Sequence, residues 1–210
     1  DENRYMTVVN AANTQKDLEW MQHHAVGAVI IEDLSEMIAL LAVQGPAAYE
    51  VMARAVDGGD SAWKTLRPFR FLEGVEIAGV RTLVSRTGYT GEDGFELYLP
   101  ATGAQQVWRA LITAGRPLGL VPAGLGARDT LRFEAALPLY GQELSAGISP
   151  VEAGFGAFVR TDKGDFIGRE ALAAQKAAGT RRRLAGIEMI DRGIPRTGYP
   201  VFAADGGAIG

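Results

Sequence analysis

The chain has 210 residues, a length typical of one large domain or of one domain with part of a second. Hydrophobic residues make up 47% and charged residues 22%, the balance of a globular protein rather than a disordered one. The net charge of -4 argues against a general nucleic-acid surface, and no apolar stretch is long enough to span a bilayer. The absence of cysteine excludes disulfides, thiolate metal sites and a cysteine nucleophile.

The N-terminal part of the chain alternates strand and helix patterns. Thr14 and Asp17 resemble a capping box that opens a helix running to about residue 25. The adjacent His23 and His24 diverge by about 100° on such a helix, so they cannot easily share a metal, and we expect no metal site. The expected elements are a strand at 5–11, the helix at 14–25, strands at 29–32 and 37–44, and a helix from Pro46 with Tyr49, Val51, Met52 and Val56 on its apolar face.

The remainder of the chain continues the pattern. It predicts strands at 69–77, 80–85, 95–99, 155–160, 183–189 and 199–202, and helices at 105–114, 127–137 and 168–178. Val107, Trp108 and Leu111 would face inward from the helix at 105–114, and Gly179 would cap the last helix. This order favours an α+β fold in which antiparallel sheets carry helices on one face.

The domain organisation follows from a change of character near residue 179, after which only strand and turn patterns occur. We therefore expect one region over 1–178 and the start of a small all-β barrel domain over 179–210. The last residues, 205–210, look like a hairpin turn with the first residues of a returning strand. Both ends look cut, and we expect the chain to be a fragment of a longer protein.

The densest polar motif lies at residues 88–96. Gly88, Gly91 and Gly94 allow positive φ and a close approach of the backbone to a ligand. Glu96 follows where a strand begins, and the two oxygens of a carboxylate suit a ligand edge with two adjacent N–H donors. The alternative is an acidic hairpin loop whose glycines serve turn geometry only.

A second polar segment spans residues 124–134. Arg128 and Arg132 lie four residues apart and share one helix face, where a ligand carboxylate or carbonyl could lie between them. The alternative is an internal network with Asp129 and Glu134. Two weaker candidates are the helix entry at 165–170, which capping explains, and Tyr140, which a core position explains as well.

Several ordered motifs give the chain a family resemblance. GYTGEDGFELY, GLGARDTLRFEAALPLYGQEL, SPVEAGFGAFV, DFIGREAL and GIPRTGYPVF closely resemble the glycine cleavage system T protein family, the tetrahydrofolate-dependent aminomethyltransferases. The resemblance covers essentially the whole chain. It implies a three-domain fold around a central folate cleft in a cytoplasmic enzyme, with no nucleic-acid or membrane partner.

The resemblance also implies a reaction. Family members release ammonia from an aminomethyl group on the lipoyl arm of the H protein and pass the one-carbon unit to tetrahydrofolate. The folate amine is the nucleophile, so the protein contributes mainly positioning and electrostatics. The expected substrate is thus tetrahydrofolate, and the expected partner is the lipoylated H protein.

The family's folate site falls on four residues of this sequence. Glu96 matches the glutamate that binds the pterin edge, and Tyr89 is similar to a tyrosine that lines the site. Arg128 matches a folate-contacting arginine, and Asn10 matches a site-lining position less securely. The family's principal catalytic aspartate lies in a segment before this chain starts, so we assign no catalytic residue here and expect the chain alone to be inactive.

Other readings stay open from the sequence alone. A related folate-dependent demethylase, or the folate domain of a dimethylglycine or sarcosine dehydrogenase, would share the fold. A non-catalytic folate-binding protein of RNA modification or iron–sulfur assembly usually keeps a cysteine motif that this chain lacks. A structural subunit with an inactive site is a third class.

Overall fold

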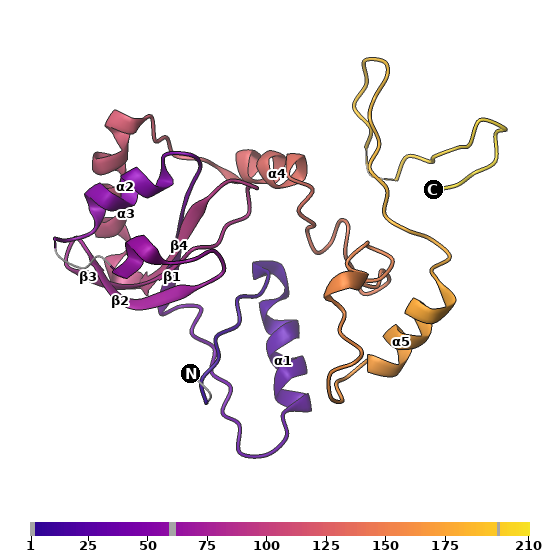
Figure 1. Ribbon diagram of the computed structural model, residues 1–210, viewed down its shortest axis with the longest axis horizontal. Helices are drawn as coiled ribbons and strands as arrows, with labels where there is room; N and C mark the ends of the chain where they lie inside the picture. The colour runs from indigo at the N-terminus through magenta and orange to yellow at the C-terminus, as the bar shows by residue number, and fades with distance from the viewer. Residues whose placement is uncertain (1–2, 59–61, 197) are drawn as a thin grey trace. The chain divides into compact units, whose positions relative to one another are not determined.

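The computed structural model describes residues 3–58, 62–196 and 198–210 (Figure 1). Asp1 and Glu2, and residue 197 of the last motif, lie outside the described residues. The chain divides into two compact units, Asp1–Gln142 and Glu143–Gly210. The expected domain boundary between 178 and 179 stays a prediction.

In the described residues of the first unit, four strands form one antiparallel sheet of order β1-β4-β3-β2. The strands are β1 (Ile38–Gln44), β2 (Phe71–Ile77), β3 (Val80–Ser85) and β4 (Gly94–Pro100). Ala78 and Gly79 make the tight turn between β2 and β3, and both have positive φ, which suits the right-handed twist of a hairpin. The fold class expected from the sequence, α+β with antiparallel strands, is confirmed.

Helices cover one face of this sheet. α2 (Ala48–Ala55) and α3 (Ala104–Gly115) pack against each other and against the strands (Figure 1). The core between these layers contains, among others, Val51, Met52, Phe95, Leu97, Leu99, Val107 and Leu111. Trp108 and Tyr49 were expected to face inward, but they are 42% and 40% exposed. Trp108 follows the buried Val107 directly, and a step of about 100° along the helix turns it outward.

The opposite face of the sheet carries polar side chains. Because side chains alternate along a strand, burying Phe95, Leu97 and Leu99 of β4 directs Glu96 and Tyr98 to the other face. The register pairs Glu96 with Ala42 of β1 and with Ser85 of β3. A carboxylate therefore stands near the middle of a sheet face that α2 and α3 do not cover.

The other helices lie near their expected positions. They are α1 (Thr14–His24), α4 (Leu125–Glu134) and α5 (Arg169–Ala178), with short 3-10 turns at Ala11–Asn13, Ala62–Thr65, Ala101–Gly103, Arg116–Leu118 and Gly156–Phe158. Gly179 ends α5 with a φ of 79°, as expected of a glycine cap. The capping box expected at Thr14 is not formed. The N-cap residue of α1 is Asn13, and the Thr14 hydroxyl donates to the Ala11 carbonyl.

Four expected strands are not strands in the described residues: 5–11, 29–32, 155–160 and 183–189. A fifth, 199–202, keeps only an isolated bridge at Phe202. A strand needs a neighbouring strand to satisfy its N–H and C=O groups, and no described residue supplies a ladder there. In the third stretch, local turn bonds replace a ladder: the amide of Phe158 donates to the Phe155 carbonyl at 2.9 Å, and that of Val159 to the Gly156 carbonyl.

The end of the second unit forms a short hairpin. The amide of Ile209 donates to the Val201 carbonyl at 2.8 Å, and Phe202 and Ala208 form an isolated bridge. The turn expected at 205–210 is therefore present. No strand is assigned over 179–210 among the described residues, so the start of a barrel domain stays a prediction.

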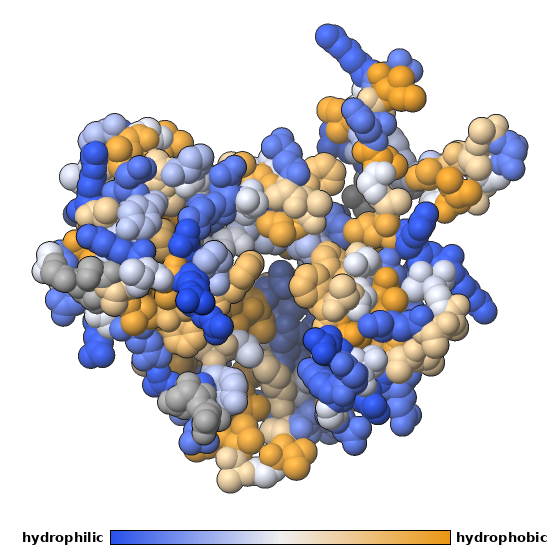
Figure 2. Space-filling model, in the orientation of Figure 1, coloured by the Kyte–Doolittle hydropathy of each residue, from blue (hydrophilic) through white to orange (hydrophobic). Residues whose placement is uncertain are grey.

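Apolar side chains remain on the surface of the first unit. On the face shown in Figure 2, they gather at the bottom of the view over the loop that follows α1. In that loop Val26 and Ile30 are 88% and 86% exposed. None of the helices built from the described residues combines the length and the apolar character needed to cross a membrane.

Candidate functional site

The loop at 86–94, which joins β3 to β4, is closed at its base by an ion pair. The Arg86 guanidinium donates to both Asp93 oxygens, at 3.0 and 2.6 Å, and to the Leu66 carbonyl at 2.8 Å. The hydrogen bond from Arg86 lowers the pKa of Asp93, with burial opposing the shift. The amide of Gly45 also donates to the Asp93 carbonyl at 2.9 Å. These contacts fix both ends of the loop on the sheet.

The glycines of the loop serve close packing. A Cβ added at Gly88 would stand 1.8 Å from Oε1 of Gln44, and one at Gly94 would stand 2.5 Å from its Cδ. Gly91 has a φ of 79°, and a Cβ there would stand 2.6 Å from Cβ of Ala135. Gly91 therefore serves both the turn and close packing on Ala135, whereas Gly88 and Gly94 leave room for the side chain at the end of β1.

Tyr89 connects the loop to α4. Its hydroxyl donates to the Pro138 carbonyl, and the Arg128 guanidinium lies over its ring with Cζ 4.6 Å from the centroid. A guanidinium stacked on an aromatic face keeps its N–H donors in the plane, where they can still reach an anion. The two polar segments of the sequence thus meet in space, with Tyr89 and Arg128 in contact.

Glu96 is oriented by its neighbours on the polar face of the sheet. Its Oε2 atom accepts hydrogen bonds from the Thr87 hydroxyl and, at 3.4 Å, from the Tyr98 hydroxyl. The Ser85 and Thr87 hydroxyls lie 3.0 Å apart, and because Thr87 spends its single proton on Glu96, Ser85 is the donor of that pair. No described residue donates to Oε1, so this oxygen can accept a hydrogen bond from a ligand.

The ionisation of Tyr98 follows from this arrangement. Burial, and then the charge and hydrogen bond of Glu96, raise the pKa of Tyr98 to about 12. The phenol therefore stays protonated at neutral pH and donates to Glu96. It holds the carboxylate with an O–H group and adds no second charge.

Arg132 shows that the internal-network interpretation is right for one of the two arginines. Its side chain is 6% exposed, lies 2.8 Å from Asp129 and donates to the Leu137 carbonyl. Because these contacts satisfy a buried guanidinium, Arg132 stabilises the end of α4. Arg128 is exposed and contacts the Tyr89 ring, so it remains the ligand candidate of the pair.

No contact among the described residues connects Asn10 to the group formed by Tyr89, Glu96 and Arg128. It is exposed, its carbonyl accepts the Asn13 amide at 2.8 Å, and its side chain makes no capping bond. Tyr140, the weaker candidate, instead contacts α1: the Lys16 ammonium lies 3.3 Å from its hydroxyl and 4.5 Å from its ring centroid.

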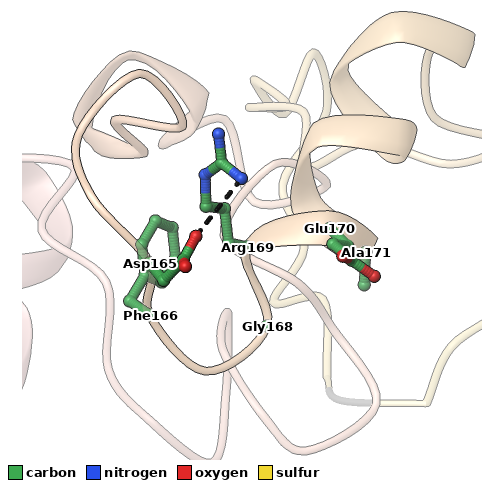
Figure 3. A pocket seen from close by; sticks show the side chains of 6 residues that line it. All are labelled: Asp165, Phe166, Gly168, Arg169, Glu170 and Ala171. Atoms are coloured by element: carbon green, nitrogen blue, oxygen red, sulfur yellow. Dashed lines mark ion pairs between the residues drawn. The ribbon is translucent and has the colours of Figure 1, made fainter.

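The second unit contains an open hollow of about 480 Å³ at the start of α5 (Figure 3). Arg169 lies 3.6 Å from Asp165 there, and its Nε donates to the Thr161 carbonyl at 2.9 Å. These contacts are local to the helix entry, but no side chain caps α5, whose N-cap residue is Gly168, so the expected capping is not seen. Among the described residues no group of three or more metal-binding side chains is present.

Sequence reasoning missed three residues that organise the group: Gln44, Thr87 and Tyr98. The spacing of Glu96 and Tyr98 is a signal that could have been used, because residues two apart on a strand share a face. Gln44 lies about fifty residues from Glu96 in the sequence, and nothing local indicates that their strands are neighbours.

Comparison with known proteins places the chain in a family. Residues 1–163 match the family described as GCVT N-terminal domain. The chain is 62% identical over 204 residues to an aminomethyltransferase from Geobacillus thermodenitrificans, covering 97% of this chain and 55% of that protein. It is 54% identical to an aminomethyltransferase from Bacillus subtilis, covering 96% of this chain and 55% of that protein.

A solved structure agrees with the sequence comparisons. It is described as the crystal structure of glycine cleavage system aminomethyltransferase T from Bartonella henselae and superposes with a TM-score of 0.80 at 31% identity. The match covers 95% of this chain and 53% of that one. The chain thus spans about half the length of the relatives it matches. On its sequence and on its fold, the chain belongs to the GCVT N-terminal domain family.

Proposed function

We propose that this chain is the tetrahydrofolate-binding part of an aminomethyltransferase of the glycine cleavage system. The observation that carries the proposal is the meeting of two distant segments, in which Arg128 of α4 stacks on Tyr89 and Glu96 is held by Thr87 of the same loop. Family membership and the names of the relatives favour this activity over a folate-dependent demethylase.

The groups present suit a reduced folate. A pterin has an edge of adjacent N–H donors, and Oε1 of Glu96 is a carboxylate oxygen with no described donor. Oε2 already accepts from Thr87 and Tyr98, so a contact with both carboxylate oxygens requires the long 3.4 Å bond from Tyr98 to open. Arg128 offers a cation for the ligand's carbonyl or carboxylate groups.

In the proposed reaction, Glu96, Tyr89 and Arg128 position the folate. The groups that catalyse the chemical step lie outside this set of residues. A folate amine attacks the aminomethyl carbon on the lipoyl arm of the H protein and ammonia leaves, and the second folate amine then displaces the lipoyl sulfur as the carbon–sulfur bond breaks. The two amine protons end on ammonia and on the released thiol, so methylenetetrahydrofolate forms with reduced lipoyl. Holding the amine in line with the carbon supplies much of the rate gain. We assign no catalytic residue within this chain, and we propose a cytoplasmic location for the enzyme.

Folate binding tests the role of Glu96. In isothermal titration calorimetry with tetrahydrofolate, Glu96→Gln should weaken binding by about 1–3 kcal/mol, the scale of a lost charged hydrogen bond. Glu92→Gln is the matched control, because Glu92 lies in the same loop, is exposed, and contacts neither Glu96 nor Tyr89 through its side chain in the described structure. Equal affinities for wild type and Glu96→Gln would contradict the proposal.

The partner is tested by turnover. In a protein extended to the full length of the relatives, we expect faster ammonia release from aminomethyl-lipoyl H protein than from a free aminomethyl-lipoamide at the same concentration. The reason is that a protein-borne arm gains binding energy from surfaces remote from the reacting carbon. Equal rates with the two donors would argue against a T-protein activity.

A further inference from the structure

We propose that Gln44 is the positioning residue that sets the 86–94 loop and, through Thr87, the carboxylate of Glu96. This inference rests on the proposed function, because it concerns the same folate site. Gln44 is the last residue of β1, and its part-buried side chain extends across the start of β4. None of the sequence motifs includes it.

The amide of Gln44 joins the two ends of the loop. Its Nε2 donates to the Thr87 carbonyl at 3.1 Å and to the Phe95 carbonyl at 3.2 Å. Its Oε1 lies 3.4 Å from the Thr90 hydroxyl, which can donate to it. One side chain thus donates to two backbone carbonyls, one at each end of the loop. Without the Gln44 amide, both carbonyls would lose this donor.

The two flanking glycines are explained by the same side chain. Gly88 and Gly94 both stand so close to Gln44 that an added Cβ would overlap it, at 1.8 and 2.5 Å from its nearest atoms. Neither glycine has a positive φ, so backbone strain is not the reason for their type. The loop and the amide are therefore sterically matched, because a side chain at Gly88 or Gly94 would displace the end of the Gln44 side chain.

The connection to Glu96 runs through Thr87. The backbone of Thr87 is held by Gln44, and its hydroxyl donates to Oε2 of Glu96. Phe95, the other residue held by Gln44, directly precedes Glu96 on β4. If the amide is removed, Thr87 loses its fixed position and Glu96 loses one of the two hydroxyls that orient it.

The packing half of the inference is tested by a double-mutant cycle in urea denaturation of the 210-residue chain. Gly88→Ala alone should lower the urea midpoint clearly, because its methyl group displaces Gln44. In the Gln44→Ala background the same change should lower the midpoint little further. Gly58→Ala, at a glycine where an added Cβ meets no atom of a described residue within 4 Å, is the control for a general cost of alanine. Additive losses would overturn the inference.

The functional half is tested by tetrahydrofolate affinity. Gln44→Ala should raise the Kd about tenfold, which is about 1.4 kcal/mol. Gln44→Glu keeps the shape of the side chain but replaces the NH2 donor with a carboxylate oxygen. Its affinity for tetrahydrofolate, taken relative to that of wild type at the same pH, should be low at pH 8. This relative affinity should rise at lower pH, as the carboxyl is protonated. Gln106→Ala is the control, because Gln106 also donates to a loop carbonyl, that of Ala78, at 2.6 Å.

The two proposals fail in different ways. If wild type binds tetrahydrofolate and the Gln44 variants bind it equally well, with no change of pH profile, the positioning role of Gln44 is wrong. If wild type itself does not bind tetrahydrofolate, the proposed function of this chain is wrong, and the role of Gln44 in the loop is then decided by the double-mutant cycle.

Discussion

At the scale of single residues, the contact between Tyr98 and Glu96 gives the protein a defined alkaline response. The pKa of Tyr98 is raised to about 12 in the folded chain, against about 10 when unfolded. The unfolded chain therefore loses this proton first, and the contribution to stability is complete below pH 10 and is lost between about pH 10 and 12. Tyr98→Phe should remove this part of the alkaline decline.

The measurement is the free energy of unfolding from urea titrations at pH 8, 10 and 11. Tyr49→Phe serves as the control, since Tyr49 is 40% exposed and packs on Trp63 without contacting Glu96 through a hydrogen bond between described residues. If the slope of stability against pH above 10 is the same in wild type and Tyr98→Phe, the phenol is not the group that responds.

Gly91 offers a second residue-scale prediction. Gly91→Ala combines a positive φ with an added Cβ 2.6 Å from Ala135, whereas the Cβ added by Gly79→Ala, at a similar φ, meets no atom of a described residue within 4 Å. Both changes should cost about 1 kcal/mol from backbone conformation, and Gly91→Ala should cost about 1–3 kcal/mol more from overpacking. Denaturation midpoints measure both, and Ala135→Gly should restore part of the extra loss. Equal losses at the two glycines would show that Ala135, at the end of α4, does not pack on the loop.

At the scale of elements, the ion pair between Arg86 and Asp93 joins β3 to β4. The lowered pKa of Asp93 means that its contribution to stability is present above about pH 3.9 and is lost as the pH falls through the folded-state value. Because the Asp93 side chain is 49% exposed, screening limits the effect of Asp93→Asn to about 1 kcal/mol at neutral pH.

Stability of Asp93→Asn is best followed between pH 2 and 7. Asp162→Asn removes a comparable two-bond contact with Arg160 at 69% and 68% exposure and should change stability less. Addition of 1 M salt should reduce both effects, since exposed charges are screened. A loss for Asp93→Asn that is unchanged at pH 2 would mean that the hydrogen bonds of Asp93, and not its charge, hold the loop.

At the scale of the whole molecule, buried apolar side chains are distributed unevenly between the two units. Every member of the core cluster in the described residues lies between Val43 and Leu111, and Ala153 is the one buried hydrophobic residue described in the second unit. Local stability follows buried contacts, so we expect amide hydrogen exchange to be slowest in β3 and β4 and fast throughout residues 143–210. Protection of α5 equal to that of β4 would contradict this.

Much of the fold could be predicted from the sequence because its signals are local. The strands β1 to β4 and the helices from α1 to α5 follow from alternation, helical periodicity and the glycine and proline residues that end them. The stretches at 5–11 and 29–32 have the same strand pattern but form none, because pairing depends on a neighbour that a sequence pattern does not contain. Strand propensity depends on the local sequence, whereas a β-ladder also depends on a second strand elsewhere in the chain.

The sequence by itself determined the family, the glycine-rich loop and the candidates Glu96, Tyr89 and Arg128. Each of these follows from a motif whose residues are close together along the chain. Only the tertiary structure decided that Arg132 is internally paired while Arg128 lies on Tyr89, and that Gln44 fills the space left by Gly88 and Gly94. The physical reason is the antiparallel pairing of β1 with β4, which brings residues about fifty positions apart to hydrogen-bonding distance.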